Sequence, residues 1–274
     1  MKLLRALIVM ALAGALAACP MSREPAKPPV WAIRDGDTTI WLMGAMHLLP
    51  PRIDWRTGTV DRAMDADTLV LETDPTATGD FDAIAKAPGL PPLAKRVADD
   101  RQEALARAIE RTGQPGDAFD GYKDWAAAVM LATGDALNSR ASSKNGIDAQ
   151  LWKAFKGKQR VALEKPGDQL RALDILPPQL QARMLDETLD GADYDATYEA
   201  WATGDLAAID KTGPSKELRP FLVTAANRRW ADWIATRMAQ KGTILVAVGA
   251  GHLAGQDSIP DLLKAKGLKV ERVQ

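Results

Sequence analysis

The short apolar runs of this chain lie mainly toward its two ends, whereas helical periodicity fills the middle. At the N-terminal side, residues 31–34 and 38–43 flank Asp35-Gly36-Asp37, and Asp-Gly favours a tight hairpin turn because glycine accepts positive φ. Four further runs have the composition of strands, the last of them alternating like an edge strand: 68–72, 160–164, 243–248 and 269–273. A sheet built by both ends of the chain is therefore expected.

Between these runs, apolar residues recur at three- and four-residue spacing, which is typical of helices. The helical segments are residues 99–112, 119–137, 146–155, 168–175, 178–189, 194–202 and 216–238, the last interrupted at Pro220. The prediction is one α/β domain over residues 30–274. It has a mixed central sheet formed by both ends of the chain, and a largely helical middle that acts as a cap.

The first 29 residues look like an export and anchoring segment. Residues 1–18 have a basic start and an apolar stretch that is too short for a permanent membrane span, as in a secretory signal. Leu16-Ala17-Ala18-Cys19 resembles a bacterial lipobox, so we expect lipid attachment at Cys19 and a tether over residues 19–29. Pro20 follows in place of a retention Asp, which favours the periplasmic side of the outer membrane. The alternative is an ordinary cleaved signal with an incidental Cys.

Composition narrows the chemistry further. The net charge of −1 gives no basic excess that would indicate nucleic-acid binding. A single Cys excludes a disulfide framework and a Cys-rich zinc site. The chain has two His, so imidazole chemistry is confined to two places.

Both His follow the same local pattern. An apolar run leads into Gly44-Ala45-Met46-His47, and another leads into Gly249-Ala250-Gly251-His252. Gly44, Gly249 and Gly251 let the chain turn and let a ligand approach the backbone. Each His then stands just beyond the carboxyl end of a strand, the edge where ligands bind in open α/β sheets.

Two carboxylates share this placement, because Glu72 and Glu164 each end an apolar run. A Glu at such a position is costly to bury unless it is paired or bound to a cation. If the four strands are parallel and adjacent, then His47, Glu72, Glu164 and His252 converge at one edge of the sheet.

Such a set suggests a divalent cation, with Mn²⁺, Co²⁺ or Zn²⁺ held by His47, Glu72 and His252. Glu164 would act as the general base or complete the ligand set. The alternative is that each His is a satisfied structural residue and each Glu an ion-pair partner.

Two further polar residues need a role. Asn227 lies on an apolar helical stripe with Val223, Trp230 and Ile234. We include it with the catalytic residues because it can position a substrate or a His, although it can equally cap a backbone group. Asp148 falls near a helix start after Asn145-Gly146-Ile147, where its charge suits the helix dipole.

These motifs resemble the TraB/GumN family, which is similar to the Tiki group of membrane-anchored metalloproteases. The resemblance covers about residues 29–273. It rests on the paired Gly-x-x-His motifs, the strand-ending Glu72, Gly146-Ile147-Asp148, Leu163-Glu164 with Gln169-Leu170, and residues 248–255. It implies an α/β fold shared with erythromycin-esterase-like and ChaN-like proteins, and a site on His47, Glu72, Glu164 and His252. One departure is Ala226, where the family often has Arg before the Asn.

The leading hypothesis is a lipid-anchored, metal-dependent hydrolase that cleaves peptide or amide bonds of a peptide or small-molecule substrate. One alternative is a metal-free hydrolase in the erythromycin-esterase manner, with His as base. Others are a non-catalytic carrier of haem or metal, as in ChaN, and an envelope assembly factor with a vestigial site.

Overall fold

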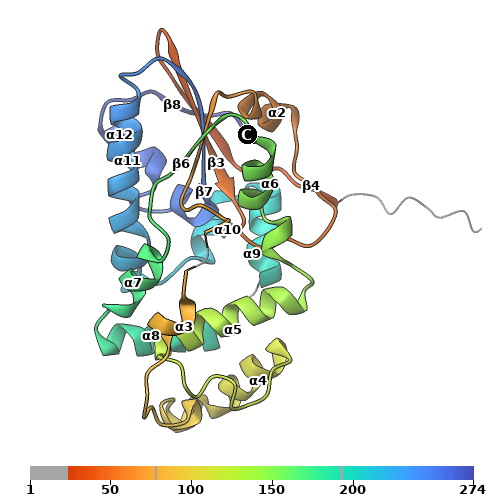
Figure 1. The fold of residues 1–274 in the computed structure, drawn as a ribbon, viewed down its shortest axis with the longest axis vertical. Helices are drawn as coiled ribbons and strands as arrows, with labels where there is room; N and C mark the ends of the chain where they lie inside the picture. Colours follow the sequence, from red (N-terminus) through yellow and green to blue (C-terminus); the bar gives the residue numbers. More distant parts are fainter. Residues whose placement is uncertain (1–23, 78, 192–193) are drawn as a thin grey trace, which may run out of the picture.

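The computed structural model describes residues 24–77, 79–191 and 194–274 and has a six-stranded sheet at the centre of an α/β fold (Figure 1). Along the sheet the strand order is β6-β5-β7-β3-β2-β8. The strands are β2 (Val30–Arg34), β3 (Thr38–Ala45), β5 (Thr68–Leu71), β6 (Gln159–Ala162), β7 (Gly242–Gly249) and β8 (Val270–Arg272). Strands β6, β5, β7 and β3 are parallel, whereas β2 and β8 run antiparallel to their neighbours. The predicted mixed sheet is confirmed, and the middle of the chain adds β6 to it. A separate parallel pair joins β1 (Glu24–Pro25) and β4 (Ile53–Asp54).

The register of the central strands determines where each His lies relative to the edge of the sheet. The Asp35 carboxylate accepts the backbone N–H of Thr38 at 2.8 Å and closes the β2–β3 hairpin. Strands β3 and β7 then pair continuously, from Thr38 opposite Gly242 to Ala45 opposite Gly249. Both Gly-x-x-His motifs therefore end on neighbouring strands at the same edge.

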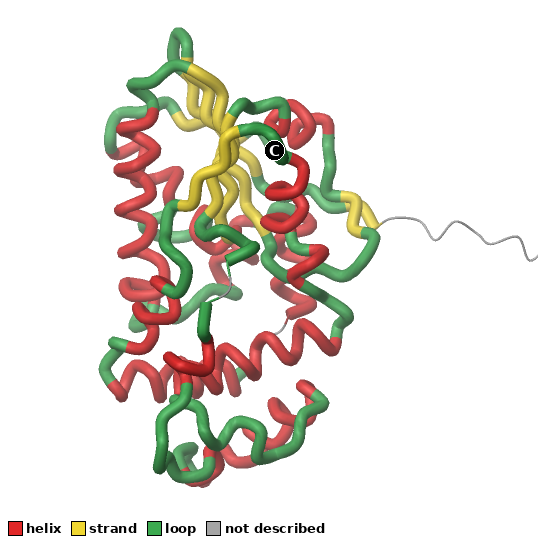
Figure 2. Tube along the Cα trace, in the orientation of Figure 1, coloured by secondary structure: helices red, strands yellow, loops and turns green. Residues whose placement is uncertain are grey.

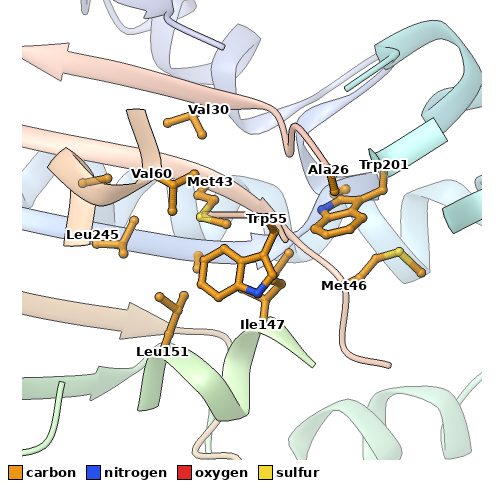
Figure 3. Packing of buried hydrophobic residues seen from close by; sticks show 14 of the residues in the cluster. Ala26, Val30, Met43, Met46, Trp55, Val60, Ile147, Leu151, Trp201 and Leu245 are labelled. Atoms are coloured by element: carbon orange, nitrogen blue, oxygen red, sulfur yellow. The ribbon is translucent and has the colours of Figure 1, made fainter. Parts of the chain in front are cut away.

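Helices cover both faces of the sheet, so its strands are apolar on both sides. On β7, Leu245 and Ala247 face one layer, whereas Ile244 and Val246 face the other. The first layer contains α2 (Gly58–Met64), α6 (Ile147–Ala154), α9 (Tyr194–Thr203) and α10 (Leu206–Lys211). The second contains α11 (Ala225–Arg237) and α12 (Ile259–Ala265). Figure 3 shows part of the first layer, where Trp55, Ile147 and Trp201 pack beneath the sheet.

The helical middle lies beyond the carboxyl ends of the parallel strands (Figures 1 and 2). It comprises α3 (Phe81–Ala85), α4 (Gln102–Thr112), α5 (Asp124–Asn138), α7 (Asp168–Asp174) and α8 (Pro178–Leu189), with the short 3₁₀ turns η1 (Leu93–Lys95), η2 (Asp99–Arg101) and η3 (Ser143–Asn145). Residues such as Leu105, Phe119 and Leu131 give it an apolar cluster of its own. This arrangement agrees with the predicted cap.

The structure departs from the expected helices where the sequence signal is short or strained. The segment predicted from residue 216 begins with a π-helical stretch, η4 (Pro220–Thr224), and becomes α-helical only at Ala225. Helices α2, α10 and α12 were not expected, because each spans two turns or less and shows too little periodicity. After β7, the chain forms the 3₁₀ turn η5 (Ala250–Leu253) that carries the second His. Within the described ranges, no helix has the length and apolar character needed to cross a membrane.

The central strand provides a test of this packing. Leu245 is fully buried on β7, so Leu245→Ala should lower the free energy of unfolding by about 2–5 kcal/mol through lost burial and a residual cavity. Urea denaturation measures the change. Leu137→Ala is the matched control, because Leu137 is 54% exposed, and its effect should stay within about 0.5 kcal/mol. Equal losses in both variants would contradict the assigned core.

Candidate functional site

Three of the predicted residues meet at the carboxyl edge of the sheet. Glu72 follows β5, His47 follows β3, and His252 lies in η5 after β7. The Nε2 atom of His47 lies 3.9 Å from Glu72 Oε2. The Nε2 atom of His252 lies 3.8 Å from Glu72 Oε1. The two imidazoles thus face one carboxylate, as the strand-end positions predicted.

The Glu72 carboxylate is held by two donors from neighbouring elements. Its side chain is only 5% exposed. The backbone N–H of Gly249 donates to Oε1 at 2.6 Å, and Gln169 Nε2 on α7 donates to Oε2 at 2.9 Å. Gln169 is part of a motif that resembles the family, but the sequence alone did not predict its contact with Glu72. Both donors fix the carboxylate without neutralising its charge.

His252 is oriented by Asn227, which lies on the predicted inward stripe of α11 and is fully buried. The Asn227 Nδ2 group donates to the backbone carbonyls of His252 and Asp257, at 3.2 and 2.8 Å. The Asn227 Oδ1 atom must therefore be the acceptor toward His252 Nδ1, at 2.7 Å. His252 Nδ1 consequently carries the proton. Asn227 both positions a His and caps the backbone, and we assign it as a positioning residue.

The surroundings of His252 favour its neutral form. Burial lowers the pKa of His252, although the charge of Glu72 opposes this effect. The ring of Trp230 lies with its centroid 4.6 Å from that of His252 and covers it. A neutral imidazole that is protonated at Nδ1 presents a lone pair at Nε2, and this lone pair faces Glu72.

His47 has a different partner and is more exposed. Its Nδ1 atom lies 2.8 Å from the Asp148 carboxylate, which stands in the first turn of α6 as expected. The negative charge of Asp148 raises the pKa of His47 above its ordinary value. Burial alone would raise the pKa of Asp148, but the charge of His47 and their hydrogen bond bring it below its usual range. The His47 side chain is 56% exposed, so solvent reaches the site from its side.

Glycines allow this close approach. A Cβ on Gly146 would lie 2.0 Å from the His47 carbonyl oxygen, so only glycine lets α6 start against the end of β3. A Cβ on Gly44 would lie 2.9 Å from Pro29 Cγ. A Cβ on Gly249 would lie 3.3 Å from Glu72 Oε1 and 3.4 Å from His47 Nε2. By contrast, nothing lies within 4 Å of a Cβ on Gly251.

Glu164 reaches the same edge but has another partner. Its backbone N–H donates to the Glu72 carbonyl at 2.8 Å, so the two Glu are neighbours along the edge. Its carboxylate, 9% exposed, binds Arg229 Nη2 on α11 at 2.6 Å. Arg229 is 61% exposed. Ala226, which directly precedes Asn227, packs against the apolar cluster to which α11 contributes.

The donor set of two imidazoles and one carboxylate suits a divalent transition metal. Metal ligands typically lie about 2.0–2.2 Å from Zn²⁺, and separations of 3.8 and 3.9 Å between N and O leave room for one ion between them. Both His also have the second partner at Nδ1 that metal-bound imidazoles usually show. Within the described residues, no group of three or more His, Cys, Asp or Glu side chains lies in a geometry that could hold a metal ion. Binding would therefore require the imidazoles and Glu72 to draw closer.

Comparison with known proteins identifies the class. The model of the TraB/PrgY/gumN family matches residues 29–272, and the chain belongs to this family. It is similar to the uncharacterized protein YbaP of Escherichia coli (strain K12), with 27% identity over 246 residues, which cover 84% of this chain and 89% of that protein. It is also similar to the uncharacterized protein YbaP of Shigella flexneri, with 27% identity over 240 residues, covering 81% and 87%. No solved structure matches the chain.

The His47–Asp148 pair can be tested by titration. Asp148→Asn removes the negative charge that favours the imidazolium, so the pKa of His47 should fall toward its ordinary value of about 6.5. The measurement is an NMR titration of the two His ring protons, in which His252 serves as the internal reference. An unchanged His47 titration would show that the two side chains are not paired in solution.

Proposed function

We propose that this protein is a hydrolase in which His47, Glu72 and His252 hold a divalent cation. The observation that carries the proposal is the Nε2 lone pair of His252, which faces Glu72 Oε1 at 3.8 Å. Two electron-pair donors in a largely buried place repel one another unless a positive charge lies between them. His47 Nε2 faces the other oxygen of the same carboxylate, so one ion would serve all three groups.

The residues of the chain would take different roles in hydrolysis. A bound cation would make a water molecule more acidic and polarise a substrate carbonyl. Asp148 and Asn227 hold the imidazoles, while Gln169 and Gly249 hold Glu72. Glu164, whose backbone N–H donates to the Glu72 carbonyl, would accept a proton from the attacking water. The choice of peptide or amide bonds as the target rests on the family resemblance.

A second candidate function uses the same residues without a metal. His47 has an Asp behind its Nδ1 atom and an exposed side chain, which is the arrangement of a general base with its orienting carboxylate. In this mechanism His47 would take the proton from water, and Glu72 would stabilise the imidazolium. Insensitivity of hydrolysis to chelators would favour it over the metal-dependent mechanism.

Calorimetric titration with Mn²⁺, Co²⁺ and Zn²⁺ tests the metal site. We expect binding at one site, lost in His47→Ala and in His252→Ala because each removes one ligand. Gly249→Ala should also abolish binding, because its methyl group would occupy the space between the three side chains. Its backbone, at φ −49° and ψ 134°, suits alanine.

Gly251→Ala is the matched control, because its methyl group meets open space and binding should persist. Circular dichroism would show that each variant is folded. Absence of binding in the folded wild type would contradict the metal site and leave the metal-free mechanism. Binding that survives Gly249→Ala would place the ion elsewhere.

We also propose that the protein is anchored by lipid at Cys19 on the periplasmic side of the outer membrane. The support is the lipobox-like sequence, which lies outside the described residues. Mass spectrometry of the protein purified from membranes should show a chain that begins at Cys19 with added acyl mass. Cys19→Ser should stop both processing at this site and acylation. An unmodified Cys19, or a mature chain that starts elsewhere, would contradict the anchor.

A further inference from the structure

The border strand β6 has a free edge beside the site. It pairs with β5 alone, and within the described part of the chain no backbone hydrogen bond joins residues 159–162 to any other segment. Gln159, Arg160 and Ala162 are exposed, whereas every residue of β5 is buried. An exposed strand edge presents unpaired N–H and C=O groups, to which another extended chain can bind.

The position of this edge distinguishes it from the other border of the sheet. Strand β6 leads within two residues to Glu164, whose backbone is bonded to that of Glu72. Strand β8, at the opposite border, lies beyond β2 and β3, and the Arg272 side chain ties it to the Gly204 carbonyl. A segment added along β6 would therefore approach the carboxyl edge where the catalytic residues lie.

Side chains along β6 alternate between two different surroundings. Gln159 and Val161 line a hollow together with Trp233 and Arg237 of α11. Arg160 points the other way, where its guanidinium lies 4.3 Å from the Trp152 ring centroid and donates to the Trp152 carbonyl. This folded-back position leaves the backbone edge of β6 open. An added strand, whose side chains also alternate, would have this hollow on one face and the Arg160–Trp152 pair on the other.

The charges at this edge favour an acidic partner. Lys158, Arg160 and Arg237 donate to backbone carbonyls, and within the described residues none of them forms a salt bridge with a carboxylate. Natural edge strands often carry positive charges as protection against unwanted pairing. Lys158 and Arg160 also lie over the rings of Phe155 and Trp152, and Arg237 lines the hollow. Carboxylates of an incoming segment would therefore meet cations that form no salt bridge within the described residues.

We propose that β6 binds an extended, acidic polypeptide segment as an additional strand of the sheet and thereby leads it to the site. Main-chain hydrogen bonds would supply affinity, and the hollow beside Arg237 on one face and the Arg160 guanidinium on the other would select side chains. That the bound segment is the substrate rests on the proposed function. The strand addition itself does not, because no residue of the edge belongs to the His47–Glu72–His252 set.

Alternating N-methylation of a peptide provides the test. The probe is a fluorescein-labelled peptide in which Glu alternates with Val, and binding is followed by fluorescence anisotropy. In an added strand only every second N–H faces β6, so methylating one set of amides should weaken binding by about tenfold or more. Methylating the other set should leave binding nearly unchanged. Equal effects of both sets, or no binding of the unmodified peptide, would overturn the proposal.

Variants of the protein test the charge argument. Arg160→Gln and Arg237→Gln should each weaken binding of the Glu-containing peptide, and a peptide with Lys in place of Glu should bind more weakly to the wild type. The matched control is Arg62→Gln, because Arg62 on α2 is also without an ion pair in the described part of the chain and donates to Thr59 of its own helix. Equal weakening by Arg62→Gln would contradict local recognition.

His47→Ala separates this proposal from the proposed function. Peptide binding should persist in this variant, whereas metal binding should be lost. Loss of metal binding with retained strand addition would leave the edge intact as a binding site. If the wild-type protein binds the metal but not the peptide, the strand addition is wrong and the proposed metal site is unaffected.

Discussion

The buried carboxylate of Glu72 is the constraint on which the rest of the site depends. An ionised carboxylate at the end of a central strand loses most of its hydration, and the surrounding protein must replace it. Gly249 on β7 and Gln169 on α7 each donate one hydrogen bond, so the carboxylate ties β5 to its neighbouring strand and to the cap. Two imidazoles face the remaining space. Removal of the carboxylate group would leave both donors unsatisfied and both His without their common partner.

The layers on the two faces of the sheet each supply one positioning residue. Asp148 comes from α6 in one layer and holds His47, whereas Asn227 comes from α11 in the other layer and holds His252. The distance between the imidazoles therefore depends on the packing of both layers against strands β3 and β7. The two sides are nevertheless unequal, because His47 is 56% exposed and His252 only 16%. Solvent consequently reaches the site past His47, and His252 lies on its more buried side.

The sequence allowed the strand-end residues to be predicted, because apolar runs that stop at Gly or Glu mark the ends of buried strands. The convergence of His47, Glu72 and His252 then required only that the strands be parallel and adjacent, which the β5–β7–β3 order confirms. The supporting pairs were beyond such reasoning. Asp148 lies 101 residues from His47, and Gln169 lies 97 residues from Glu72. Their contacts depend on how the helices pack on the sheet, and hydrophobic periodicity does not define the position of a helix on the sheet.

The two strand-ending Glu illustrate how similar sequence contexts acquire different surroundings. Glu72 is fixed by neutral donors and faces imidazoles, whereas Glu164 is paired with the exposed guanidinium of Arg229. Two adjacent carboxylates would repel each other, and the positive charge of Arg229 beside Glu164 offsets this repulsion. Carboxylates in different surroundings can take different roles in one reaction. This difference in surroundings underlies the separate roles that we propose for Glu72 and Glu164.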